Sequence, residues 1–199
     1  MCQHLTEQEE YVEGTTLVVA LGSGVHEVVG SSFSPGVGTC QQTLSVPINN
    51  LSFVGKGEGE TIVHGCFIVE GRKLCVAGLT VKSPTGHGLV AFGAATEMIL
   101  ENVTIEDCQN RMHGVYVSEA MTTARLTNCT SHHNKINGVV SNAGAVVDLM
   151  GEGTSVHDNE DTACTHAPVG RAWRRHPSTS TNLAFSMTCP TETNYKISA

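Results

Sequence analysis

The stretch NVTIEDCQNRMHGVYV, residues 102–117, reads as a strand, a polar corner and a second strand. The same pattern returns in NCTSHHNKINGVVS, residues 128–141. GLTVKS precedes the first copy and GTSVHD follows the second, so the four copies start at Gly78, Asn102, Asn128 and Gly153. A constant period of about 25 residues indicates a repeat architecture in which each copy is one structural unit.

A second landmark keeps the same period. The glycines of GHGLVA, MHGVYV and INGVVS, at Gly88, Gly114 and Gly138, are again about 25 positions apart. Apolar and polar residues alternate inside each copy, as they do in strands with one buried face. Three short strands per copy therefore predict the coil of a β-solenoid. The side chains expected to face inward are Leu79/Val81, Val103/Ile105, Cys129/Ser131 and Thr154/Val156 in one strand, Leu89/Ala91, Val115/Val117 and Val139/Ser141 in the next, and Met98/Leu100, Ala124/Leu126 and Val147/Leu149 in the third.

Residues 51–159 resemble the right-handed parallel β-helix of the pectin-lyase-like superfamily, and the stretches GTTLVVALGSGVHEV and LSFVGKGEGETIVHG look like the first coils of such a helix. In that family an asparagine at a turn often stacks on its counterpart in the next coil. Asn102 and Asn128 stand where this ladder is expected, with glycine in the same place at Gly78. The resemblance specifies the fold and says almost nothing about function.

The expected fold class is therefore all-β: a right-handed, single-stranded parallel β-helix with about 24–26 residues per coil and about five to seven coils. We expect this domain to occupy residues 15–166. Solenoids need caps because a bare terminal coil leaves an open sheet edge. Residues 1–14 are predicted to form an N-terminal cap, and residues 167–199 an irregular C-terminal tail or cap.

The chain is acidic, with a formal net charge of −8 over 199 residues. An acidic surface disfavours nucleic acid and anionic membranes, because both attract clusters of Lys and Arg. A polysaccharide or a protein remains open as a partner, although an acidic polysaccharide would need a bridging cation. No basic segment followed by an apolar run opens the chain, so we see no signal peptide and expect an intracellular protein unless the N-terminus is incomplete.

The chain contains eight cysteines, which form no CxxC motif and show no Cys/His spacing typical of zinc ligands. An even number would permit a disulfide framework in an exported protein. Without a signal peptide, buried free thiols are the favoured interpretation. We therefore expect neither a metal site nor any cofactor from the motifs.

The coil register predicts a column of exterior side chains made of Lys82, Glu106, His132 and His157, followed in the next position by Ser83, Asp107, His133 and Asp158. Carboxylates and imidazoles on successive coils are suited to acid–base chemistry or to holding a cation. The alternative is a solvated exterior on which opposite charges of adjacent coils avoid repulsion. The candidate catalytic residues on this surface are Glu106, Asp107, His132, His133, His157 and Asp158.

The motif GHGLVAFG, residues 86–93, resembles the Gly-His-Gly segment of polygalacturonase-type glycoside hydrolases, which share this fold. Those enzymes are expected to use paired acidic residues on either side of the scissile bond. Here the only comparable pair, Glu106–Asp107, follows His87, whereas in that family the acidic pair comes first. The Asn-Thr-Asp and Arg-Ile-Lys elements are absent, and His113 repeats the motif one coil later, which is typical of a coil corner.

The other enzyme branches of the superfamily find little support. Pectate-lyase relatives use an acidic calcium cluster and an arginine base. Arg125 and Asp148 occupy equivalent positions in the third strand of successive coils, and a surface ion pair between them is the favoured interpretation. The Asp-Pro-His-Glu signature of alginate-epimerase relatives is missing.

Two classes of function follow. The first is a non-catalytic binding or scaffolding module whose flat strand faces contact a carbohydrate or a protein, with Tyr116 as an exterior aromatic able to stack on a sugar ring. The second is a carbohydrate-active enzyme (a polysaccharide lyase, an epimerase or a glycoside hydrolase) that uses the acidic and histidine surface. The missing catalytic sets favour the first class.

Overall fold

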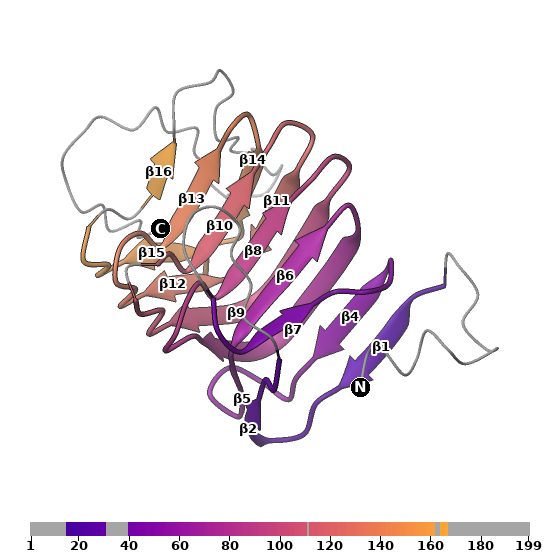
Figure 1. The fold of residues 1–199 in the computed structure, drawn as a ribbon. Helices are drawn as coiled ribbons and strands as arrows, with labels where there is room; N and C mark the ends of the chain where they lie inside the picture. Colours follow the sequence, from indigo (N-terminus) through magenta and orange to yellow (C-terminus); the bar gives the residue numbers. More distant parts are fainter. Residues whose placement is uncertain (1–14, 31–39, 111, 162–163, 167–199) are drawn as a thin grey trace.

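The computed structural model describes residues 15–30, 40–110, 112–161 and 164–166, where the regular structure consists of β-strands without a helix. Every strand pairing in this part is parallel and joins strands of successive coils. Figure 1 shows the coils stacked along one axis, from β1 and β2 at one end to β15 and β16 at the other. The chain thus forms a parallel β-solenoid of about five turns, as the sequence period predicts.

The strands stack in three columns. The first contains β1 (Leu17–Ala20), β4 (Leu51–Val54), the first half of β7 (Lys73–Lys82), the first half of β9 (Glu97–Glu106), β11 (Thr123–Thr127) and β14 (Val146–Met150). The second contains β2 (Gly24–Glu27), β5 (Thr61–His64), the second halves of β7 and β9, β12 (Thr130–His132) and β15 (Ser155–His157). The third contains β3 (Thr43–Ser45), β6 (Cys66–Glu70), β8 (Leu89–Phe92), β10 (Val115–Ser118), β13 (Val139–Asn142) and β16 (Cys164–His166).

A left-handed residue forms the corner between the first and second columns. Gly78, Asn102 and Asn128 have φ angles of 60°, 52° and 51°. Glycine and asparagine are the residues that enter this conformation most readily, which explains their alternation at this corner. The register places the three residues at equivalent positions of adjacent coils. The Asn128 side chain also reaches the following coil, where its Oδ1 accepts the Gly153 N–H at 3.4 Å.

The core runs along the inside of the solenoid. The apolar side chains that alternation predicts to face inward are buried there, and only Leu149 is partly exposed. Ser131, Ser141 and Thr154 occupy the same inward columns as buried polar side chains. The assignment of faces from sequence is therefore confirmed for the inward positions.

A second apolar cluster lies on the outward side of the third column. It combines Ile68, Val90, Tyr116 and Val140 with Cys40 and Cys66. Tyr116 is only 6% exposed, so its prediction as an exposed exterior aromatic is wrong. The rings of His87 and His113 pack against it, and its hydroxyl accepts a 2.8 Å hydrogen bond from Asn142 Nδ2.

An inward polar column follows the second strand of each coil. Its members, Ser83, Cys108, Asn134 and Asn159, are all buried. The Ser83, Cys108 and Asn134 carbonyls each accept a backbone N–H from the next coil, which defines the column. Asn134 Nδ2 donates to Asn159 Oδ1 at 2.9 Å, and Asn134 Oδ1 accepts the Cys108 N–H at 3.2 Å. The assignment of Ser83 to the exterior beside Asp107 is wrong, because the coil of Ser83 lacks the extra left-handed residue that Asp107 provides.

Five cysteines are free thiols: Cys40, Cys66, Cys75, Cys108 and Cys129. For these five, the interpretation as free thiols is confirmed. Cys2 and Cys189 lie outside the described residues, as do the segments 1–14 and 167–199 for which caps are predicted. Over the described ranges, no helix long and apolar enough to cross a bilayer is present.

Candidate functional site

A continuous row of polar side chains runs along the exterior of the second column. We call it the polar strip; it consists of Glu27, His64, Lys82, Glu106, His132 and His157, which are consecutive partners in the strand register. Adjacent members are one coil apart, about 4.8 Å. The sequence predicted the last four members. The first two continue the pattern in GVHEV and TIVHG, and the irregular spacing of these early copies hid the match.

Carboxylates lie against lysine or histidine side chains of the neighbouring coil along the polar strip. His64 Nδ1 lies 2.9 Å from Glu27 Oε1, and Lys82 Nζ lies 2.8 Å from Glu106 Oε1. The other Glu106 oxygen, Oε2, lies 3.3 Å from His132 Nε2. The His132 ring stacks in turn on that of His157, with centroids 5.4 Å apart and planes 5° from parallel. From Lys82 to His157 the strip is thus connected by an ion pair, a carboxylate–imidazole contact and a pair of stacked rings.

A second left-handed corner directly follows the polar strip. Asp107, His133 and Asp158 have φ angles of 56°, 53° and 50°. Successive strand side chains normally point to opposite faces, but here the residue after the strip turns back to contact the strip. Asp107 Oδ2 lies 3.0 Å from Lys82 Nζ, and Asp158 Oδ2 lies 2.7 Å from His157 Nδ1.

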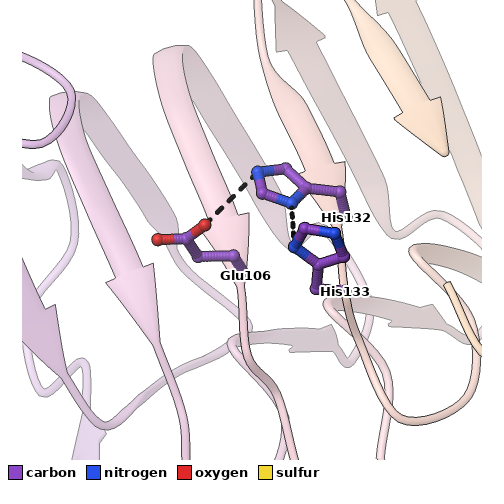
Figure 2. Close-up of side chains that lie close together, drawn as sticks. All are labelled: Glu106, His132 and His133. Carbon is purple, nitrogen blue, oxygen red and sulfur yellow. Dashed lines mark hydrogen bonds and ion pairs between the residues drawn. The ribbon is translucent and has the colours of Figure 1, made fainter. Parts of the chain in front are cut away.

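At the centre of the surface this corner joins three side chains, Glu106, His132 and His133, which we call the Glu–His–His cluster (Figure 2). His132 Nδ1 and His133 Nδ1 are 2.8 Å apart, a hydrogen-bond distance between two ring nitrogens. One of the two must donate and the other must accept. If His132 Nε2–H faces the Glu106 carboxylate, its Nδ1 is the acceptor and His133 Nδ1–H the donor. The open nitrogen of His133, an exposed residue, is then a proton acceptor.

The electrostatics of the cluster favour a neutral central imidazole. Burial lowers the pKa of His132, the Glu106 carboxylate opposes that shift, and the neighbouring imidazoles of His133 and His157 add to it. Hydrogen bonding to Glu106 raises the pKa of Lys82, so its ammonium form is stabilised. The surface therefore combines a fixed cation, carboxylates and imidazoles within adjacent coils.

Two pairs of residues that the sequence places on neighbouring coils are backbone neighbours in the structure. His133 and Asp158, which the sequence placed in one exterior column, meet through the backbone, where the His133 N–H donates to the Asp158 carbonyl at 3.0 Å. The side chain of Asp158 instead contacts His157. Arg125 and Asp148 are register neighbours, but the ion pairs of the described residues do not include one between them, so that prediction is wrong.

The Gly-His-Gly motif lies away from the Glu–His–His cluster, at the corner that leads into the third column. The His87 ring is fully buried, and its Nδ1 accepts the His113 N–H at 3.1 Å. One coil later, His113 Nδ1 accepts the Asn137 N–H at 3.4 Å. The repeated contact identifies the motif as a coil corner, in agreement with the sequence interpretation.

The Glu–His–His cluster is also a group of residues able to hold a metal ion. Each of the three offers one ligand atom, and these atoms lie within 4.8 Å of one another. The cysteine and histidine spacings predict no metal site, although the column of carboxylates and imidazoles is suited to holding a cation. Here the ligands come from two successive coils, and the left-handed conformation of His133 brings the third into place.

Compared with protein-family models and with curated protein sequences, the chain has no significant match. The fold and the geometry of the polar strip are therefore the basis for the functional proposal.

Proposed function

We propose that this protein is a non-catalytic binding module whose polar strip and adjoining corner contact a carbohydrate or a protein. The observation that carries this proposal is the position of Lys82, whose ammonium group lies 2.8 Å from Glu106 and 3.0 Å from Asp107. One cation thus contacts both carboxylates of Glu106–Asp107, the pair that is comparable to the acidic pair of a glycoside hydrolase.

A glycoside hydrolase needs one carboxylic acid that donates a proton and one carboxylate that acts as base or nucleophile. Here both carboxyl groups, Glu106 and Asp107, contact the same Lys82 ammonium group. The two roles need two different environments, and this shared contact gives the two groups similar ones. The pair is better suited to presenting a fixed pattern of charges than to acid catalysis.

Partial burial makes the polar strip a prepared binding surface. The side chains of Lys82, Glu106, His132 and His157 are 28%, 21%, 17% and 27% exposed. Their ion pairs and ring stacking restrict these side chains before any ligand arrives, which reduces the entropy lost on binding. Donors and acceptors that repeat about every 4.8 Å along a flat face suit an extended partner with regularly spaced polar groups.

The proposal is tested by thermal unfolding of the full chain with a panel of neutral and acidic oligosaccharides and polysaccharides, with and without Ca²⁺. A ligand that binds only the folded chain raises Tm. We expect one glycan class to raise Tm for the wild-type chain and for Lys73→Gln, and to have no effect on a Lys82→Gln/His157→Gln variant. Lys73 is the matched control because it pairs with Glu97 at 3.0 Å on the first column, away from the strip.

A shift that persists in the strip variant would place the glycan elsewhere and contradict the proposal. The absence of a shift with any glycan, for a chain that unfolds cooperatively, would favour the protein partner, which is then sought by cross-linking through residues of the strip.

The second candidate function is a carbohydrate-active enzyme. It is favoured by the order Glu106–His132–His133, in which a 3.3 Å carboxylate–imidazole contact is followed by a 2.8 Å hydrogen bond between the two rings. The order ends in an exposed imidazole, which is the arrangement of an oriented base. This alternative predicts consumption of the bound glycan and its loss in His133→Asn, while affinity is retained. Binding without turnover, measured by product analysis on the same glycan, favours the binding module.

A further inference from the structure

We propose that the Glu–His–His cluster binds a divalent transition-metal ion, with Zn²⁺ as the ion to test, through one carboxylate oxygen of Glu106 and one ring nitrogen each of His132 and His133. This inference does not depend on the carbohydrate or protein partner proposed above, because it concerns only these three side chains and the ion.

The distances in the cluster are close to those that a zinc ion requires. The two Nδ1 atoms face each other 2.8 Å apart and are joined by a hydrogen bond, drawn as a dashed line in Figure 2. Zn–N distances of about 2.0–2.1 Å in tetrahedral geometry place two ligand nitrogens about 3.3 Å apart. A ring movement of about half an ångström therefore allows a metal ion to replace the proton.

The carboxylate completes the ligand set from the neighbouring coil. Glu106 and His132 are register partners in β9 and β12, and the ligand atoms of all three residues lie within 4.8 Å of one another. Glu106 Oε2 now contacts His132 Nε2 at 3.3 Å, so its side chain has to rotate toward the Nδ1 edge of the ring to reach the metal. The movement stays within one side chain and leaves the backbone register unchanged.

The donor types select the kind of ion. Two imidazole nitrogens and one carboxylate oxygen are typical ligands of Zn²⁺ and of other borderline first-row ions, whereas Ca²⁺ and Mg²⁺ prefer sets of oxygen ligands. Three protein ligands leave a fourth tetrahedral position open. His133 is exposed, so this position faces solvent and is accessible to water or to an oxygen atom of a ligand.

Three neighbouring side chains affect metal binding at the proposed site. Lys82 opposes it, and Asp107 and His157 support it. The Lys82 ammonium lies 2.8 Å from Glu106 Oε1, so it repels an incoming cation and competes for the carboxylate. Asp107, 3.0 Å from Lys82 Nζ, gives that ammonium group another partner when Glu106 turns to the metal. The His157 ring stacks on His132 and fixes its orientation. Removal of the Lys82 charge should therefore tighten metal binding.

The experiment is isothermal titration of Zn²⁺ into the full chain under reducing conditions, for the wild type and single variants. Glu106→Gln and His132→Gln each remove one ligand. His133→Asn removes the third and keeps a residue that tolerates the left-handed conformation, as Asp107 and Asp158 do at the equivalent corners. His64→Gln is the matched control because His64 occupies the same polar strip outside the cluster. Thermal unfolding without metal verifies that each variant is folded.

We expect one Zn²⁺ site whose affinity falls at least about tenfold in each ligand variant, stays unchanged in His64→Gln and rises severalfold in Lys82→Gln. Because the chain contains cysteines, Co²⁺ is titrated in parallel: nitrogen and oxygen ligands give visible ligand-field bands without the intense ultraviolet charge-transfer band of a thiolate. The proposal is overturned if the folded chain does not bind Zn²⁺, if binding survives His133→Asn, if His64→Gln weakens it equally, or if Co²⁺ reports thiolate ligation.

Discussion

At the scale of single residues, His87 shows how a side chain that resembles a catalytic group serves the fold. The ring is fully buried, and it lies 5.3 Å from the ring of His113 and 5.4 Å from that of Tyr116. Its Nε2 has no hydrogen-bond partner among the described residues. Burial lowers the pKa of His87 to about 3, with a further contribution from His113. The native state therefore holds this imidazole neutral.

The buried imidazole makes stability depend on pH in one direction. Above pH 6.5, the ordinary pKa of histidine, His87 is neutral in both states and contributes no pH dependence. As the pH falls from 6.5 toward 3, the unfolded chain binds the proton and the folded chain does not. The free energy of unfolding should then fall by up to about 1.4 kcal/mol per pH unit for this group. Urea unfolding at a series of pH values measures it.

His87→Gln is the variant that isolates this effect. It should unfold more readily at pH 7, because the His113 N–H loses its partner, but its stability should depend less on pH below 6.5. Burial also lowers the pKa of His113, so some slope should remain. A slope identical to that of the wild type would contradict the account of His87.

Gly114 tests how closely successive coils approach. A Cβ at this position would meet the Gly138 carbonyl oxygen and Ser131 Oγ, each at 2.6 Å. Gly114→Ala should therefore lower the free energy of unfolding by about 3 kcal/mol, because backbone of the next coil has to move. Gly22→Ala is the control, since a Cβ there has no heavy atom within 4 Å. Equal stability of the two variants in chemical denaturation would contradict the coil spacing.

At the scale of elements, the inward polar column stabilises the turn after each second strand. Asn134 donates to Ser131 Oγ at 3.1 Å and to Asn159 Oδ1 at 2.9 Å, and it accepts the Cys108 N–H at 3.2 Å. Because all these groups are buried, the loss of Asn134 leaves donors and acceptors without partners.

Asn134→Ala should lower the free energy of unfolding by about 3 kcal/mol, judged from the cost of burying unsatisfied polar groups. Asn102→Gly should change it by less than about 1 kcal/mol, because Asn102 is exposed at a left-handed corner where the preceding coil has Gly78. Denaturant titration of both variants measures the difference. A larger effect at Asn102 would show that the ladder predicted from the sequence, and not the buried one, supports the coils.

The elements also show what alternation can predict. The inward positions of β9, β10 and β11 follow from the sequence because each strand has one consistently apolar face. For Tyr116, alternation gives the correct outward direction but not the burial. The outward side of its column is covered and also apolar, with Val90 and Val140 as its register partners. A single alternating pattern does not report whether the outward face meets solvent or other side chains.

At the scale of the whole molecule, the stack converts residues about 25 positions apart into neighbours along the polar strip. Each exposed or half-exposed ion pair is worth only about 0–1 kcal/mol. Lys82→Gln and His157→Gln should therefore shift the free energy of unfolding by less than about 1 kcal/mol each, as measured by denaturant titration. A loss several times larger would assign the strip to stability and weaken its assignment to binding.

The candidate site could be predicted from the sequence in part. The period placed Glu106 opposite His132 and put His133 beside Asp107 in the next position. It did not predict the left-handed corner that turns His133 back onto His132. Aspartate and histidine adopt a positive φ more often than most residues but still uncommonly, so their identity alone does not mark this corner. The cation-holding role suggested by the column of carboxylates and imidazoles did not specify the three ligands, because His133 joins Glu106 and His132 only through that turn.

The central claim is that Glu106, His132 and His133, from two coils, form one connected unit, through the 3.3 Å contact of Glu106 with His132 and the 2.8 Å hydrogen bond between the two rings. Histidine ring nitrogen NMR at neutral pH and without added metal tests it most directly, because it reports which nitrogen of each ring carries the proton. We predict Nε2–H for His132 and Nδ1–H for His133, with both preferences lost in Glu106→Gln. If both rings show Nε2–H, or exchange freely between the two forms in the wild-type chain, the unit does not exist and the claim is wrong.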